Sequence, residues 1–151
     1  MNEIKPVDTI EARLRELTEQ KRHALSLPPE KAMAAILDSP RPAALVHAIP
    51  EEDLYLLIQD IGVEDALELL GLASNRQWAF ILDMSIWEKD RISLAEWTRW
   101  LYLLMKADPV RLVRWIAEER MEEMEYYLLQ NLDLARSEER RVGKECRSRG
   151  A

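Results

Sequence analysis

The sequence is poor in the residues that supply flexibility or chemistry. Its 151 residues include 4 glycines, 2 histidines and a single cysteine, Cys146. One cysteine cannot form an internal disulfide bond, and the chain has neither a Gly-rich phosphate-binding loop nor a Gly-x-Ser-x-Gly nucleophile motif. His23 and His47 each lack a second histidine or a cysteine at the spacing of zinc ligands. We therefore predict no catalytic, metal-binding or cofactor-binding residue, and no cofactor.

Long apolar segments are missing as well. A transmembrane helix needs about 20 consecutive apolar residues, but the best candidate, "WTRWLYLLMKADP", is interrupted by Arg99 and Lys106. The first residues, "MNEIKPVDTIEARLREL", contain early acids and no apolar core of a signal peptide. These patterns predict a cytoplasmic protein without a membrane span.

Positive charge is also in short supply. The whole chain has a formal net charge of -7, and residues 1–135 carry 15 basic and 25 acidic side chains. Nucleic acids and anionic membranes both bind proteins that have a surplus of lysine and arginine, so neither is an expected partner. The hydrophobic content of 48% is nevertheless typical of a globular protein, and the length suits one domain.

Helical signals dominate what is present. Asp8, followed three residues later by Glu11, predicts a capped first helix from about Thr9 to Ala24. Its apolar residues form a narrow stripe and its other faces are charged, so we expect it to lie on the surface. The stripe consists of Ile10, Leu14, Leu17 and Ala24.

The following helices are short. Pro28 or Pro29, and later Pro42, suit the first turn of a helix, where the missing N–H of proline would have no partner. Ser74 with Gln77 predicts another capped start. Ile49, Ile61, Leu72 and Met84 recur at intervals of about 12 residues, which suits one short helix and a turn. Such helices are stable only when stacked, so we predict an all-α fold: an array of short antiparallel helices in a solenoid-like superhelix.

Longer helices are expected after Ser93. Ser93 and Glu96 predict a capping box, and the helix that follows places one apolar face at Trp97, Trp100, Leu101, Leu104 and Met105. Asp108 is the expected cap of a helix that begins at Pro109. In the last helix, residues 121–132, we expect an apolar face that is partly uncovered. That face consists of Met121, Met124, Leu128 and Leu132, with Tyr127 beside it.

Tryptophans and acidic residues are the candidates for ligand binding in this sequence. The five tryptophans are Trp78, Trp87, Trp97, Trp100 and Trp115. Their helical spacing predicts core positions, except for Trp87, which lies in the irregular segment "SIWEKDR". The acids at Glu51–Asp53, Glu64–Asp65 and Glu118–Glu125 could gather a magnesium ion. We favour the simpler interpretation that they face solvent and, in the first two cases, stabilise helix N-termini.

The end of the chain differs in character from the rest. The segment 136–149, "RSEERRVGKECRSR", holds six basic residues, three acidic ones and Cys146. It can be read as a solvated basic tail, or as a nucleic-acid arm or reactive thiol. We favour another interpretation, because the segment resembles a short-read sequencing adapter translated as coding sequence. That resemblance implies that the natural gene continues past Ala135.

Two families resemble the body of the chain. The segments "EEDLYLLIQDIG", "EDALELLGLAS" and "QWAFILDMSIWEKDRI" resemble the start of a bacterial all-α family of unknown function, of delta-proteobacterial type. "LPPE" and "IPEEDLYLLIQDI" are similar to the cytoplasmic N-domain of MgtE-type magnesium transporters, a superhelix of short helices. The first resemblance covers roughly residues 27–132 and implies a longer cytoplasmic protein with no assigned activity. No metal-binding residue is transferred from the second.

These observations predict three regions and a non-catalytic role. Residues 1–26 form an N-terminal surface helix, residues 27–135 a helical-repeat domain that is part of a longer protein, and residues 136–151 a disordered, non-native tail. The expected function is a helical scaffold, protein-interaction or regulatory domain, whose partner is another protein or the missing C-terminal domains of the same chain. The alternatives are a cytoplasmic magnesium-sensing domain, and the N-terminal part of an enzyme whose catalytic region is missing.

Overall fold

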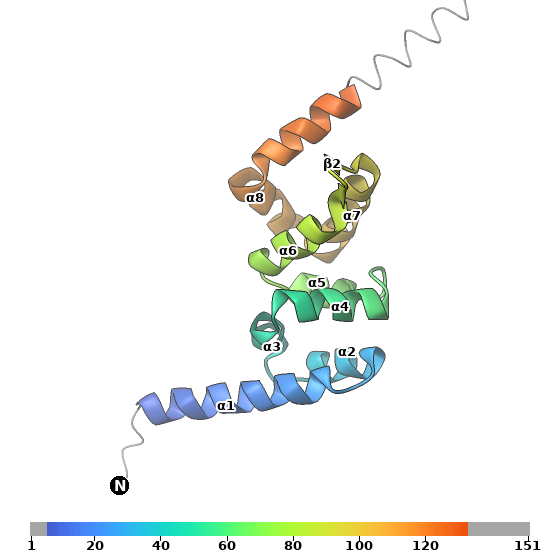
Figure 1. The fold of residues 1–151 in the computed structure, drawn as a ribbon. Coiled ribbons are helices and arrows are strands. Elements are labelled where there is room, and N and C mark those ends of the chain that lie inside the picture. Colours follow the sequence, from blue (N-terminus) through green and yellow to red (C-terminus); the bar gives the residue numbers. More distant parts are fainter. Residues whose placement is uncertain (1–5, 133–151) are drawn as a thin grey trace, which may run out of the picture. The chain divides into compact units, whose positions relative to one another are not determined.

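Figure 1 shows the fold in a computed structural model, which describes the backbone of residues 6–132 and the side chains of residues 9–132. The described chain is helical apart from one short β-hairpin, which confirms the predicted all-α class. It divides into two compact units, and the boundary in the sequence falls between Pro109 and Val110. Across the described residues, no helix combines the length and the apolar character that crossing a membrane would need. The predicted tail, residues 136–151, lies outside the described part.

The first unit contains seven helices and the hairpin within its described residues. The helices are α1 (Pro6–Leu25), α2 (Pro29–Leu37), α3 (Pro42–Ala48), α4 (Glu51–Ile61), α5 (Leu67–Leu72), α6 (Asn75–Ile86) and α7 (Leu94–Ala107). The strands of the hairpin are β1 (Trp87–Glu88) and β2 (Arg91–Ile92), between α6 and α7.

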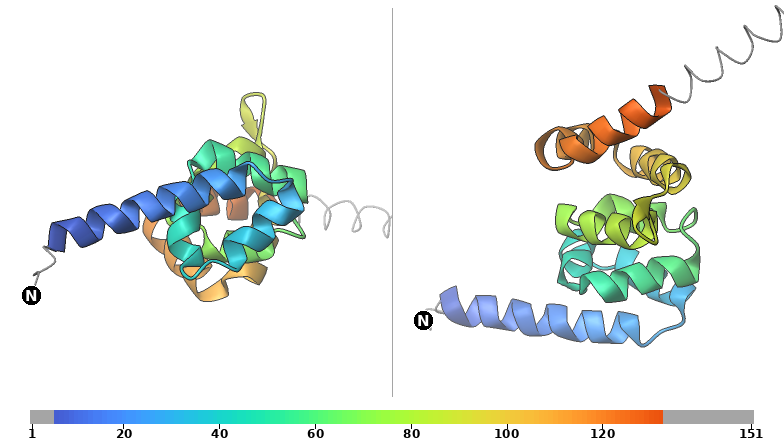
Figure 2. Two further views of the ribbon diagram at one scale, coloured as in Figure 1. Left: turned by 90° about the horizontal axis from the view of Figure 1, so that it is seen from below. Right: turned by 45° about the horizontal axis from the view of Figure 1, so that its top comes forward.

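Within this unit each helix contacts the helix two places further along the chain. One row of contacts joins α1, α3, α5 and α7, and a second row joins α2, α4 and α6. Contacts of α1 with α2, of α2 with α3 and of α6 with α7 connect the two rows. Figures 1 and 2 show the resulting stack of helices. Each of the helices α2 to α7 buries apolar side chains. This is the stacked arrangement of short helices expected from the sequence.

The predicted proline starts of two short helices are confirmed, whereas the predicted start of the first helix is wrong. Pro29 and Pro42 are the first residues of α2 and α3. The first helix, however, begins at Pro6 and not at Thr9, so Asp8 lies inside α1 and does not cap it. Proline at the first helical position accounts for the earlier start, because its fixed φ suits the helix and its lack of an N–H costs nothing there.

The predicted helix start at Glu64–Asp65 is also wrong. Gly62 ends α4 with a φ of 104°, a left-handed region that glycine enters without a steric penalty. Its carbonyl then accepts hydrogen bonds from the N–H groups of Asp65 and Ala66, both at 3.0 Å, which closes a turn. As a result α5 begins only at Leu67, and the acid in its first turn is Glu68.

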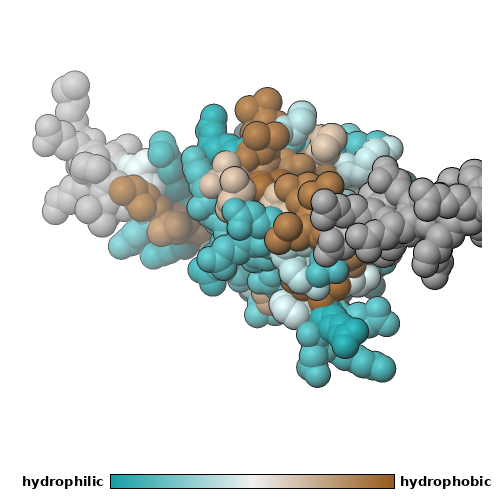
Figure 3. Space-filling view, turned by 90° about the horizontal axis from the view of Figure 1, so that it is seen from above, coloured by the Kyte–Doolittle hydropathy of each residue, from teal (hydrophilic) through white to brown (hydrophobic). Residues whose placement is uncertain are grey.

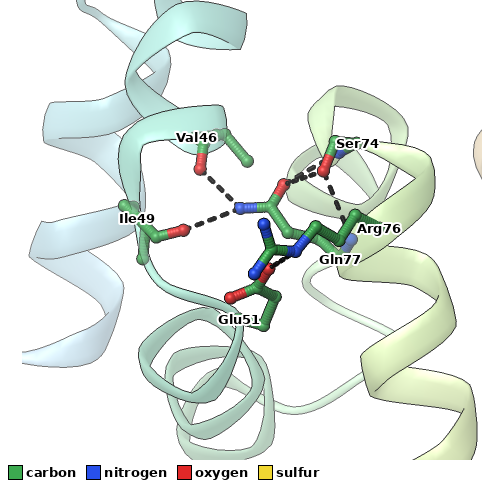
Figure 4. A network of polar contacts seen from close by, with 6 residues as sticks. All are labelled: Val46, Ile49, Glu51, Ser74, Arg76 and Gln77. Carbon is green, nitrogen blue, oxygen red and sulfur yellow. Dashed lines mark hydrogen bonds and ion pairs between the residues drawn. The ribbon is translucent and has the colours of Figure 1, made fainter.

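The side chain of Gln77, on α6, forms hydrogen bonds with the end of α3 (Figure 4). It is the buried polar residue of the described chain, and its Nε2 donates to the carbonyls of Val46 (2.8 Å) and Ile49 (2.9 Å) at the end of α3. The Val46 carbonyl also accepts from the Ile49 N–H at 3.0 Å, whereas carbonyls at a helix end otherwise lack a partner within the helix. Its Oε1 accepts from the N–H of Ser74 (2.8 Å), while the Ser74 hydroxyl accepts from the Gln77 N–H (3.2 Å). The predicted capping box of α6 is therefore confirmed, and its amide also bridges two helices.

The helix after Ser93 partly follows the prediction. Ser93 Oγ accepts from the Glu96 N–H at 3.4 Å, as a cap should, but the Glu96 carboxylate lies 3.6 Å from Arg99. Trp97, Trp100 and Leu104 are buried and Leu101 is half-buried, as expected for the inner face. Met105 was assigned to that face wrongly: it is exposed, and Leu103 is buried instead.

The second unit is small in its described part. It contains α8 (Pro109–Glu119) and a helical segment, residues 121–132. Trp115 is buried, its Nε1 donates to Glu119 at 3.1 Å, and the Arg120 guanidinium lies 5.4 Å from its ring. In residues 121–132 the expected apolar face divides in two. Met124 and Tyr127 are half-buried, whereas the members that stay exposed are Met121, Leu128 and Leu132.

Candidate functional site

The five tryptophans separate into four core residues and one surface residue. Trp78, Trp97, Trp100 and Trp115 each expose 2% or less of their surface, which confirms their predicted core positions. Trp87 exposes 53%, and Met84, one helical turn earlier at the end of α6, exposes 54%. Exposing the large apolar surface of a tryptophan to water is unfavourable. The exposure of Trp87 therefore distinguishes it from the other tryptophans of the chain.

Trp87 belongs to a β-hairpin, which occupies the segment predicted to be irregular. Trp87 pairs with Ile92, and Glu88 with Arg91, in an antiparallel register. The N–H of Ser93 donates to the carbonyl of Ile86 at 2.8 Å and closes the base of the hairpin. The turn passes through Lys89, whose φ of 58° is left-handed. Figure 2 shows the hairpin projecting from the stack of helices.

A shallow depression of about 180 Å³ lies beside Met84. Side chains of α4, α6 and α7 line it, including Tyr55, Gln59, Met84 and Arg99. The ring of Tyr55 packs edge-on against Phe80, with centroids 6.3 Å apart. The lining therefore brings aromatic, amide, thioether and guanidinium groups together on one surface of the first unit.

Arg99 forms ion pairs with two carboxylates at this surface. Its guanidinium donates to Glu64 at 2.7 Å and lies 3.6 Å from Glu96. The hydrogen bond from Arg99 lowers the pKa of the Glu64 carboxyl below its ordinary value, and a bond to the Glu64 backbone adds to that effect. The same pair raises the pKa of Arg99. With two carboxylates around one guanidinium, the group has no surplus positive charge for an anionic ligand.

The predicted acidic clusters do not form one site. Glu51 pairs with Arg76 and Glu64 with Arg99, so these carboxylates have cationic partners. Within the described residues, no group of three or more histidine, cysteine, aspartate or glutamate side chains is arranged to hold a metal ion. His23 and His47 are both exposed and lie on different helices.

We refer to Met84, Trp87, Glu96 and Arg99 as the Trp87 surface: Trp87 follows Met84 by about one helical turn, and Glu96 and Arg99 line the depression beside Met84. It combines two exposed apolar side chains with charged groups in fixed ion pairs. Tryptophan and arginine are the residues most enriched at the energetic centres of protein interfaces. The arrangement suits contact with another macromolecule better than enclosure of a small molecule, because the adjoining depression is shallow and open.

Comparison with known proteins places the chain in a family. A model of a family of unknown function, DUF6178, matches residues 9–150. The chain belongs to this family. The match agrees with the family of unknown function expected from the sequence, while its delta-proteobacterial type stays a prediction. No curated protein and no solved structure matches the chain.

Two other predictions are unchanged by these comparisons. The similarity to the N-domain of MgtE-type transporters stays a prediction, because the match to a family of unknown function does not test it. The family match runs through residues 136–149, the segment interpreted as a translated adapter. Because a matched range does not identify which of its residues resemble the family, the interpretation of this segment also stays a prediction.

Proposed function

We propose that this chain is a helical protein-interaction domain that binds a protein partner through the Trp87 surface. The observation that carries the proposal is the exposed Trp87 side chain on a projecting hairpin. The other four tryptophans are buried in the helical core, so the exposure of Trp87 is not a general property of tryptophan in this fold.

The hairpin gives Trp87 a defined position before any partner binds. Its base is closed by the hydrogen bond from Ser93 to Ile86, and β1 pairs with β2 in a fixed register. A contact residue that is already ordered loses less conformational entropy on binding. Glu96 and Arg99 supply a polar rim, which favours a correctly oriented partner over others.

Quantitative affinity capture from the organism that encodes the chain tests this proposal. We expect the partner to be recovered with wild-type protein and with Tyr102→Ala, and to be lost by about tenfold or more with Trp87→Ala. Tyr102 is the matched control, because it is an exposed aromatic residue (56%) on α7 of the same unit. A specific partner that binds Trp87→Ala as well as wild type would contradict the assignment of this surface.

Magnesium sensing and a catalytic role remain alternative predictions. The ion pairs of Glu51 and Glu64 would have to open before either carboxylate could take a metal. A ligand that binds the native state raises its stability. If millimolar magnesium raised the midpoint of thermal unfolding above that in sodium chloride of equal ionic strength, the sensing role would replace the interaction role as the better proposal.

A further inference from the structure

Two apolar surfaces of this chain have flanking charges of opposite sign. The first is a groove of about 240 Å³ between α1 and α3, in the first unit. We call it the α1 groove; it is lined by Ile10, Arg13, Leu14, Leu17, Arg41 and Ala44. Ile10 and Leu14 are both more than half exposed, so the apolar stripe of α1 extends beyond the part that α2 and α3 cover.

Basic side chains border the α1 groove on both sides. Arg13 comes from α1 itself and forms no ion pair with any described residue. Arg41 precedes α3 and lies 3.7 Å from Glu16, a long and solvent-exposed pair. An amphipathic helix that brought carboxylates to this edge would find one uncompensated guanidinium and one that is weakly paired.

The second surface belongs to the helical segment 121–132, in the second unit. Its exposed apolar side chains lie on one helical face, and Figure 3 shows hydrophobic side chains at the surface in a view that includes this segment. That face consists of Met121, Leu128, Leu129 and Leu132. Glu122 lies at its edge and Glu125 lies within it, one turn from both Met121 and Leu129, and both are exposed. Neither forms an ion pair with another described residue, so this apolar face carries two exposed carboxylates.

We propose that the helical segment 121–132 of one copy docks in the α1 groove of a second copy. The two surfaces match in chemistry: Leu14 and its neighbours meet Leu128 and Leu129, while Arg13 and Arg41 meet Glu122 and Glu125. The contact is heterologous, since it joins different surfaces of the two copies. Such contacts repeat head to tail and produce rings or open chains. This inference concerns a different surface from Trp87 and does not depend on the proposed function.

Sedimentation velocity of the 151-residue chain over a wide range of concentration tests the proposal. The buffer is reducing, so that Cys146 cannot crosslink copies. We expect wild type to associate as its concentration rises. Leu14→Glu and Leu129→Glu should each weaken association by about tenfold or more, because each places a carboxylate in an apolar contact. Leu56→Glu is the control: Leu56 is as exposed as Leu14, at 57%, but lies outside both surfaces.

Mixing the two variants distinguishes this geometry from a symmetric dimer. Leu14→Glu keeps an intact helix 121–132, and Leu129→Glu keeps an intact α1 groove. Their equimolar mixture should form a 1:1 dimer that does not grow, because the remaining two surfaces are both altered. Failure of the mixture to associate, wild type that stays monomeric throughout, or equal weakening by Leu56→Glu would each overturn the proposal.

A charge exchange provides a second measurement that preserves the apolar contacts. Arg13→Glu alone should weaken association, and so should Glu125→Arg alone. The two changes in one chain should restore it, because the exchanged charges again attract. Circular dichroism of each variant verifies that the helices are intact. If the double variant associates no better than either single variant, the charge pairing proposed here is wrong.

Discussion

The two units of this chain differ sharply in how they bury apolar surface. Nearly all buried hydrophobic residues of the described chain lie in the first unit. Each helix of that unit contacts at least one helix two places before or after it in the chain. Among the described residues of the second unit, only Leu112 and Trp115 are buried, while Val110, Val113 and Leu129 are each more than 60% exposed. A shared helical character therefore does not imply shared burial. Because helices this short depend on their neighbours for stability, we expect the two units to differ in stability as well.

Removing a large core side chain should reveal this difference most strongly. Trp78 is 1% exposed and its Nε1 donates to the Leu70 carbonyl at 2.7 Å. Trp78→Ala should lower the free energy of unfolding by about 3–5 kcal/mol, through lost burial and an unfilled cavity. Leu129→Ala, in the second unit, should change it by less than about 0.5 kcal/mol. Urea denaturation measures both, and similar losses would show that the two units are stabilised alike.

The buried amide of the first unit should have the next largest effect. Gln77→Leu removes both donors to Val46 and Ile49 and leaves those carbonyls without their bonds from Gln77. The Val46 carbonyl keeps its bond from the Ile49 N–H at 3.0 Å, whereas the Ile49 carbonyl loses its donor. A buried polar group that loses its partner costs about 1–3 kcal/mol, so we expect a loss of about 1–3 kcal/mol in urea denaturation. Gln59→Leu, at an exposed position of α4, is the matched control and should be close to neutral. A neutral Gln77→Leu would mean that the bridge between α3 and α6 contributes little.

Hydrogen exchange should show the same contrast without any mutation. Backbone amides of residues 121–132 have few buried side chains around them, whereas those of α4 and α6 lie in the stack. Local opening is easier where few apolar contacts must break. We expect protection factors in 121–132 to be at least about tenfold lower than in α4, a difference of about 1.4 kcal/mol. At high protein concentration the proposed self-association would reduce this difference, so the measurement is made on dilute protein.

The smallest expected effect is electrostatic and confined to the first unit. Because the folded-state pKa of Glu64 is lowered from its ordinary value of 4.5, its ion pair with Arg99 stabilises the fold at pH values above 4.5. That stabilisation is lost as the pH falls through the lowered pKa. Glu64→Gln should therefore reduce the thermal midpoint slightly at neutral pH and not at strongly acidic pH. Glu52→Gln, an exposed acid on α4, is the control. A deficit that persists in acid would show that Glu64 acts through something other than its charge.

Local chemistry accounts for the parts of the fold that the sequence predicts well. Some helix starts depend only on residues within one turn of the same helix, so the sequence predicts them without knowledge of the tertiary structure. These are Pro29, Pro42 and the Ser74–Gln77 pair. The hairpin at residues 87–92 was missed because its turn is Lys-Asp and not the Asn-Gly typical of tight hairpins.

The candidate site was predictable only in part, because its members come from distant segments. Trp87 was singled out by its place outside the helical pattern. The link between Glu64 and Arg99, however, joins residues 35 positions apart, and the second role of Gln77 spans about 30. Neither contact leaves a local pattern, since both depend on which helices the stack brings together. Met84 was expected at a repeating helix end, and its exposure follows from the extension of α6 to Ile86.

The two rows of stacked helices also bear on how the first unit folds in time. Contacts between helices two places apart are close in sequence, and chains with such local contacts fold faster than those whose partners are distant. No helix of the stack needs a distant part of the chain as its packing partner. During synthesis, α4 can join α2, and α5 can join α3, as soon as each has formed. The stack can therefore assemble on the ribosome in the order of its helices.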